Sequence, residues 1–176
     1  AALAAATATV RPGDAVSPPP TASAMSAAMA RGALEGARGN SGLILSQFWR
    51  GLAEAARGSR TLGVEELKRG LASGCALACR AVTRPVAGTI LTVMQDVARA
   101  AEALAGELPA FLRRVVEEAR ESVARTPRLL AVLRRAGVVD AGAEGLHRIL
   151  EGAWRYLQQR AGLPAPKEEA EDPGPP

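Results

Sequence analysis

Apolar residues recur every three or four positions through most of this chain, which is the spacing of one face of an α-helix. A clear case is the stretch from Glu65 to Val82, where Leu67, Leu71 and Cys75 share a face. Alternation with a period of two, typical of a half-buried strand, is absent over any useful length. The pattern therefore predicts an all-α fold.

Glycine, proline and capping residues divide the chain into helical segments separated by short connections. The predicted helices run from Thr21 or Ser23 to about Ala37, from Ser41 to about Arg57, from Glu65 to Val82, from Ile90 to about Ala105, from Leu108 to Ala124, from Pro127 to Ala136 and from Ala143 to Ala161. Proline is placed near the start of a segment because the first helical turn does not need its missing N–H. The short connections favour antiparallel neighbours.

The two ends of the chain differ from its body. Residues 1–9 read as the end of a helix that starts upstream, and the proline-rich stretch that follows terminates it. We therefore expect about seven helices and an eighth, truncated one at the beginning. Residues 1–162 are expected to form one domain, and residues 163–176, rich in proline and acidic side chains, a disordered tail or linker.

Composition narrows the class of protein. Hydrophobic residues make up 48% of the chain but aromatic ones only 3%, so leucine, valine and alanine must fill the core. The net charge is +4, and because the tail is acidic, the body is more basic still. Its arginines are scattered singly, without the basic stripe and aromatic residues of a nucleic-acid interface. No apolar run is long enough to span a membrane, and two cysteines fit a reducing compartment, so a soluble, cytoplasmic protein is expected.

Three segments that directly precede predicted helices carry the candidate binding residues: Gly39, Asn40, Ser41 and Gly42 in the first, Gly88 and Thr89 in the second, and Asp140, Ala141 and Gly142 in the third. Glycine-rich turns at helix N-termini present backbone N–H groups to phosphate oxygens. The same residue types are also ordinary helix caps, the role that the strong preference for Asp at this position favours for Asp140, which could alternatively accept hydrogen bonds from a ribose or a base. Both interpretations stay open on the residues alone.

Catalytic and metal-binding groups are scarce. The four aspartates are widely separated, and no lysine follows Gly42 as a strict phosphate loop requires. Cys75 and Cys79 share a helix face, but they do not complete a tetrahedral metal site and are interpreted as buried thiols. His147 is interpreted as a surface or core histidine rather than a general base. The sequence therefore leaves the catalytic residues unknown and offers no obvious metal site within these 176 residues.

The motifs G-A-R-G-N-S-G-L-I-L-S-Q at 36–47, P-V-A-G-T-I-L-T-V at 85–93 and A-G-V-V-D-A-G at 136–142 together resemble the DhaL-like family. That family includes the nucleotide-binding subunit of bacterial dihydroxyacetone kinase and the N-terminal kinase domain of bacterial fatty-acid kinase, and the details look more like the second. The resemblance covers about residues 22–160. Three motifs in the right order make it specific.

The resemblance implies an antiparallel barrel of eight helices that binds ATP or ADP among the loops at one end. Asn40 and Ser41 match positions near the phosphates, Gly88 and Thr89 a second contacting loop, and Asp140 with the two residues after it a late loop near the nucleotide. It also implies phosphoryl transfer from Mg-ATP to an acyl carboxylate, presented by a separate fatty-acid-binding protein, or to a small hydroxyketone. A homodimer is a further open expectation.

Two departures from the family pattern limit this expectation. The D-G-D-T-G loop whose aspartates hold magnesium is absent, so those ligands are expected upstream of Ala1. Ala87 stands where relatives often carry glutamate. We therefore expect the 176 residues alone to bind nucleotide weakly and to transfer no phosphate. The alternatives are a non-catalytic nucleotide-binding regulatory module and a helical interaction domain.

Overall fold

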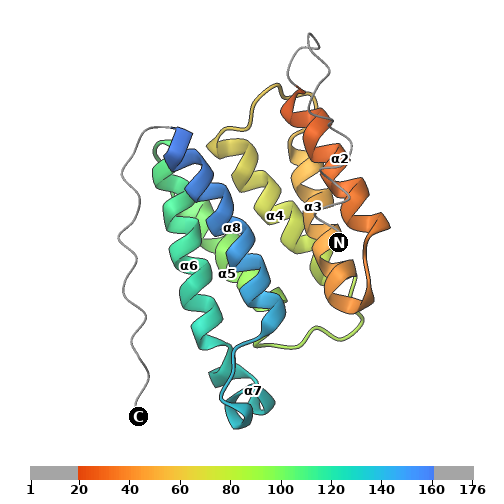
Figure 1. The fold of residues 1–176 in the computed structure, drawn as a ribbon, viewed down its shortest axis with the longest axis vertical. Helices are drawn as coiled ribbons and strands as arrows, with labels where there is room; N and C mark the ends of the chain where they lie inside the picture. The colour runs from red at the N-terminus through yellow and green to blue at the C-terminus, as the bar shows by residue number, and fades with distance from the viewer. Residues whose placement is uncertain (1–19, 161–176) are drawn as a thin grey trace.

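The computed structural model describes residues 20–160 and contains seven helices and no strand within that range (Figure 1). The helices are α2 (Ala22–Glu35), α3 (Gly39–Ala55), α4 (Val64–Arg80), α5 (Ile90–Ala103), α6 (Leu108–Leu129), α7 (Ala131–Ala136) and α8 (Ala141–Arg160). The predicted all-α class is confirmed. The helix expected at residues 1–9 and the tail at 163–176 lie outside the described residues.

The six long helices run alternately up and down the long axis of the bundle (Figure 1). Each of α3 to α6 packs against the helix before it, and α8 returns to lie against both α6 and α5. This alternation places the N-termini of α3, α5 and α8 at one end of the bundle, the lower end in Figure 1, which we call the loop end. The three motif-bearing segments all lie there.

Helix α5 is the centre of the apolar core, because it contacts α4, α6 and α8. Half of its residues are buried: Ile90, Leu91, Val93, Met94, Val97, Ala98 and Ala101. Phe48 of α3 and Phe111 of α6 supply the largest fully buried side chains of the described part of the chain. Aliphatic and alanine side chains fill the remaining space, as the low aromatic content requires.

Helices α3 and α4 approach each other backbone to backbone at three glycines. A Cβ atom built on Gly51 of α3 would lie 2.1 Å from the backbone nitrogen of Gly74 of α4. A Cβ atom on Gly70 would lie 2.6 Å from a methyl carbon of Leu52. The contact exists only because these positions carry no side chain, and it fixes the position of α3 relative to the core.

Helix α6 does not end before Pro127 as predicted; it continues to Leu129, with Pro127 inside it. Proline cannot donate the hydrogen bond that the carbonyl of Val123 would receive from that position. Thr126 replaces it, because its hydroxyl donates to the oxygen of Val123 at 2.7 Å. The break instead lies at Leu130, whose extended backbone separates α6 from α7.

Cys75 and Cys79 are free thiols on the face of α4 that packs toward the core. Gln95 of α5 donates to the sulfur of Cys79 at 3.6 Å. Burial, and then the neighbouring Cys79, raises the pKa of the Cys75 thiol to about 12. The sequence interpretation of the pair as buried thiols is met only in part, because both side chains pack against the core but stay partly exposed.

We predict that Cys75 resists alkylation in the native protein. With its pKa raised to about 12, its thiolate fraction at neutral pH should be roughly a thousandfold below that of an unperturbed thiol. The measurement is the rate of iodoacetamide modification of Cys75 in the unsubstituted protein, followed by peptide mass spectrometry, in buffer and in urea. Equal rates in the two solvents would contradict the prediction.

None of the helices within residues 20–160 combines the length and the apolar character needed to cross a membrane.

Candidate functional site

The first motif forms a tight turn between α2 and α3 at the loop end. Helix α2 ends at Glu35, and Gly39 begins α3 with a positive φ of 62° that favours glycine. A Cβ atom on Gly42 would lie 3.1 Å from the Cα atom of Ala37, so the turn folds closely against the first turn of α3. Arg38 fixes the turn further by donating to the carbonyl oxygen of Ala37 at 2.8 Å.

Asn40 and Ser41 do not cap α3, which corrects one of the two sequence interpretations. The N-cap position belongs to Arg38, whose side chain makes no capping hydrogen bond. Asn40 and Ser41 follow in the first turn; both are exposed, and neither side chain hydrogen-bonds to another residue within 20–160. The N–H groups of this first turn have no partner within the helix, and no side chain of residues 20–160 caps them. This N-terminus is therefore open to an anion.

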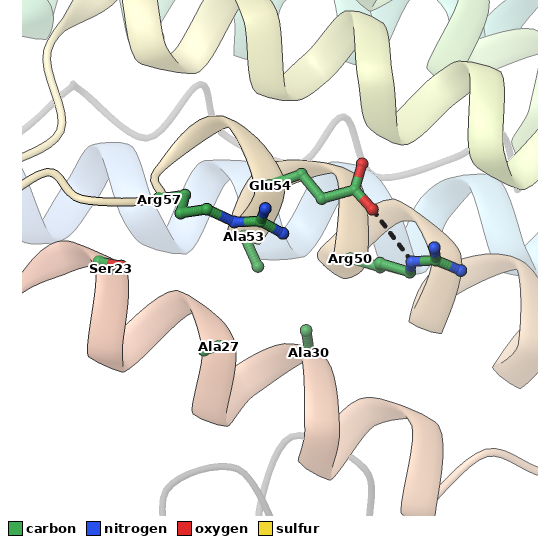
Figure 2. Close-up of a pocket in the computed structure, with 7 residues that line it drawn as sticks. All are labelled: Ser23, Ala27, Ala30, Arg50, Ala53, Glu54 and Arg57. Atoms are coloured by element: carbon green, nitrogen blue, oxygen red, sulfur yellow. Dashed lines mark hydrogen bonds and ion pairs between the residues drawn. The ribbon is translucent and has the colours of Figure 1, made fainter.

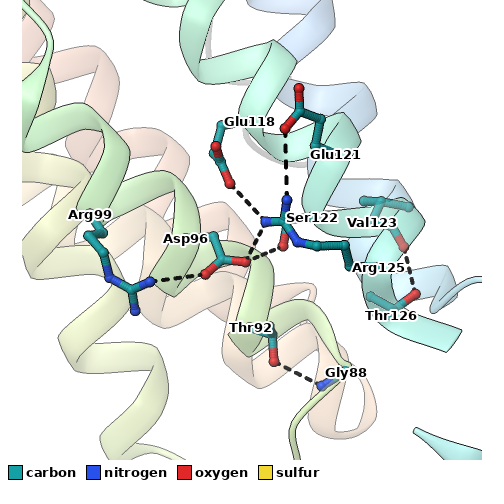
Figure 3. A network of polar contacts seen from close by, with 10 residues as sticks. All are labelled: Gly88, Thr92, Asp96, Arg99, Glu118, Glu121, Ser122, Val123, Arg125 and Thr126. Atoms are coloured by element: carbon teal, nitrogen blue, oxygen red, sulfur yellow. Dashed lines mark hydrogen bonds and ion pairs between the residues drawn. The ribbon is translucent and has the colours of Figure 1, made fainter. Parts of the chain in front are cut away.

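The second motif approaches the end of α6 rather than open space. Gly88 is buried with φ 81°, and a Cβ atom on it would lie 2.9 Å from the carbonyl oxygen of Thr126. Its N–H donates to the hydroxyl of Thr92 at 2.9 Å (Figure 3). Thr89 occupies the N-cap position of α5 without capping it, and its hydroxyl donates to the carbonyl of Val86 at 2.8 Å. Gly88 thus serves internal packing.

The third motif is joined to the second by one carboxylate oxygen. Oδ1 of Asp140 accepts a hydrogen bond from the N–H of Ala143 at 2.8 Å and another from the N–H of Ile90 at 3.0 Å. The first bond caps α8, as the capping interpretation proposed, and the second caps α5 from fifty positions away in the chain. Ala141 is exposed and Gly142 packs beside Ile90. One oxygen of Asp140 therefore accepts a backbone N–H from the N-terminal turn of each of two helices.

Thr126 was not singled out from the sequence, yet it holds Asp140 in place. It is fully buried, and its hydroxyl accepts from the N–H of Asp140 at 3.1 Å while donating to Val123. The threonine before Pro127 was a usable signal, since a proline inside a helix leaves a carbonyl that a nearby hydroxyl can satisfy.

A polar network ties α5 to α6 beside this region (Figure 3). The guanidinium of Arg125 bonds to Asp96 at 3.0 Å and to Glu118 at 2.9 Å, and Ser122 donates to Asp96 at 2.7 Å. Hydrogen bonds to Glu118 and then to Asp96 raise the pKa of Arg125 above its usual range. Every charge in this network has a partner, which fits a structural role.

No group of three histidine, cysteine, aspartate or glutamate residues within 20–160 could hold a metal ion. His147 is buried in α8 with its Nδ1 atom 3.7 Å from a carboxylate oxygen of Glu144, beyond hydrogen-bonding distance. It faces the core, so the general-base interpretation gains no support. Asp140 is the only carboxylate in the three motifs.

A groove of about 350 Å³ lies between α2 and α3 (Figure 2). Three alanines and Ser23 form much of its lining, and Arg50 and Glu54 pair at 3.1 Å along α3 at its edge. None of the nine residues proposed from the sequence lines it. The groove is therefore separate from the loop-end site.

Comparison with known proteins identifies the domain type. Residues 2–155 match the family described as DAK2 domain. The chain is 42% identical over 146 residues to protein YloV of Bacillus subtilis, covering 78% of this chain and 26% of that protein. It is 40% identical over 145 residues to an uncharacterized protein of Staphylococcus epidermidis, covering 80% and 26%. The chain thus spans about a quarter of the length of these relatives.

Proposed function

Because the chain belongs to the DAK2 domain family, the DhaL-like kinase-related group, we propose that its loop end binds the polyphosphate of ATP or ADP. In the longer proteins of which such chains form about a quarter, this domain would supply the γ-phosphoryl group to an acyl carboxylate or a small hydroxyketone. Residues 1–162 would form the nucleotide-binding unit, and residues 163–176 a linker or tail.

The observation that carries the proposal is the contrast between three helix N-termini at one end. The carboxylate of Asp140 already occupies the position of an anion at the N-termini of α5 and α8. The N-terminus of α3 has no such group, and Asn40 and Ser41 stand exposed beside it. Phosphate oxygens would therefore be held by the first turn of α3, by these two side chains and by Arg38.

This assignment gives the other motifs a different role from the one expected. Asp140 is negatively charged and would repel a phosphate, so we assign it the positioning of α5 and α8 and not a phosphate contact. Gly88 and Thr89 shape the loop that precedes α5 and lies beside Asp140.

Magnesium does not fit the described residues, which offer no cluster of carboxylates at the loop end. We therefore derive no step through the metal. A second candidate function is a regulatory module that binds nucleotide without transferring phosphate. A phosphoryl-transfer assay with Mg-ATP and fatty acid or dihydroxyacetone, on the whole protein, distinguishes the two, because only the kinase consumes ATP in proportion to the acceptor.

The proposed site is tested by replacing Asn40 and Ser41 together with alanine. Neither side chain is bonded within the described chain, so the melting temperature should not change. The affinity for ATP and ADP should fall at least about tenfold, because a hydrogen bond to a charged phosphate contributes about 1.5–3 kcal/mol. Isothermal titration calorimetry measures both ligands, and AMP should bind more weakly than either.

The matched control is Ser59→Ala, a serine between α3 and α4 at the opposite end of the bundle. It should leave both the affinity and the melting temperature unchanged. If the double substitution leaves ATP binding intact, the first turn of α3 is not the phosphate site. If the chain binds no nucleotide at all, the helical interaction domain becomes the better interpretation.

A further inference from the structure

Large apolar side chains are exposed mainly at the loop end. Of the eight exposed large hydrophobic residues in the described chain, only Tyr156 belongs to the body of a helix far from this end. The other seven lie at the lower ends of helices or in the connections there: Leu34, Leu43, Val86, Leu129, Val132, Val138 and Val139. Clustered exposed apolar residues mark a surface that meets another molecule.

The densest part of this cluster is the segment 128–139, which contains α7 and which we call the α7 tip. Leu129, Val132 and Val138 are each at least half exposed, and no residue of α7 is buried. The tip projects beyond the ends of α6 and α8 (Figure 1). A helix that buries none of its own residues gains little stability from packing against the bundle. We therefore expect its apolar side chains to contact another molecule.

The charge of the α7 tip is of one sign. Arg128, Arg134 and Arg135 are exposed, and none of them forms an ion pair with another residue of the described range. The segment 128–139 contains no acidic residue and no neutral hydrogen-bonding side chain. Elsewhere on the bundle, as in the pairs of Arg148 with Glu144 and Glu151, arginines are neutralised by carboxylates on the same helix.

We propose that the α7 tip docks on the surface of an anionic lipid bilayer. Aliphatic residues that enter the interface beside arginines that meet anionic headgroups are the chemistry of interfacial membrane binding. A convex, protruding tip suits a deformable lipid surface. The segment offers no acidic and no neutral polar side chain, so its arginines can meet only acceptors such as headgroup phosphates, while its aliphatic side chains enter the apolar layer below them. The inference is independent of nucleotide binding, and docking would bring the loop end within reach of amphiphilic molecules.

The test is co-sedimentation of the full chain with two kinds of vesicle, one of phosphatidylcholine alone and one of equal parts phosphatidylcholine and phosphatidylglycerol. Binding to the anionic vesicles and its loss at high salt are expected. The Arg134→Gln/Arg135→Gln protein should bind them about thirtyfold more weakly, since each arginine near an anionic surface contributes about fivefold. Val132→Ser should weaken binding as well, because it removes aliphatic burial.

The matched control is Arg57→Gln/Arg60→Gln, which changes the net charge equally at the opposite end of the bundle and should leave vesicle binding unchanged. Equal loss in the two double variants would overturn the proposal in favour of nonspecific charge attraction. Absence of binding to anionic vesicles would also overturn it. If sedimentation velocity without vesicles showed self-association that Val132→Ser abolishes, the tip would be an interface between copies of the chain instead.

Discussion

Asp140→Ala is expected to lower the free energy of unfolding by about 3 kcal/mol, because the substitution leaves two helix N-termini without their shared acceptor. The N–H of Ile90 and the N–H of Ala143 both donate to the same carboxylate oxygen. Alanine has no acceptor to offer either of them. Urea denaturation followed by circular dichroism gives the value directly.

Asp140→Asn is the matched control, since an amide oxygen can still accept both hydrogen bonds while the negative charge is removed. Its cost should be about 1 kcal/mol, the part due to the interaction of the charge with two helix dipoles. The affinity of this protein for ATP should be retained, because Asp140 is assigned a positioning role. If the alanine and asparagine proteins lost equal stability, the two hydrogen bonds would not account for the stabilising effect of Asp140. A large loss of ATP affinity in Asp140→Asn would contradict the positioning role.

The periodic pattern of apolar residues was sufficient to predict the all-α class and the approximate helices. The predicted boundary at Pro127 was wrong. This proline indicated a helix start, but it lies inside α6, because the hydroxyl of Thr126 donates to the carbonyl oxygen that proline leaves without a donor. Helix ends shifted for a similar reason. Gly39 begins α3 two residues earlier than predicted, because glycine accepts the positive φ of the turn.

The sequence was sufficient to propose which residues form the candidate site, but not how their side chains are arranged. The sequence placed three cap-like motifs before three helices, and alternation of helix direction brings those N-termini to one end. What spacing could not reveal is that Asp140 caps α5 across fifty positions, so that α3 is the one of the three motif-bearing helices whose N-terminus remains open. The exposed apolar residues of the α7 tip were likewise hidden, because a local pattern does not tell which helix has a partner.

Gly51→Ala is expected to destabilise the protein by about 3 kcal/mol, as overpacking against a rigid neighbour does. The added Cβ atom would lie 2.1 Å from the nitrogen and 2.3 Å from the Cα atom of Gly74. These are backbone atoms of α4, so no side-chain rotation relieves the clash, and the two helices must separate. The separation would also displace Phe48, which packs against Gly74 from the preceding turn of α3.

The control for Gly51→Ala is Gly152→Ala in α8, where an added Cβ atom meets nothing within 4 Å. Alanine is the better helix former by about 1 kcal/mol, so this protein should be slightly more stable than the parent. The same gain in helix propensity acts at Gly51, and the clash must exceed it to produce a net loss. Thermal and urea unfolding of the two proteins therefore separate the steric clash from helix propensity. The expected result is a loss of stability for Gly51→Ala and a gain for Gly152→Ala. A gain of stability in both proteins would mean that α3 and α4 do not approach as closely as the structure places them.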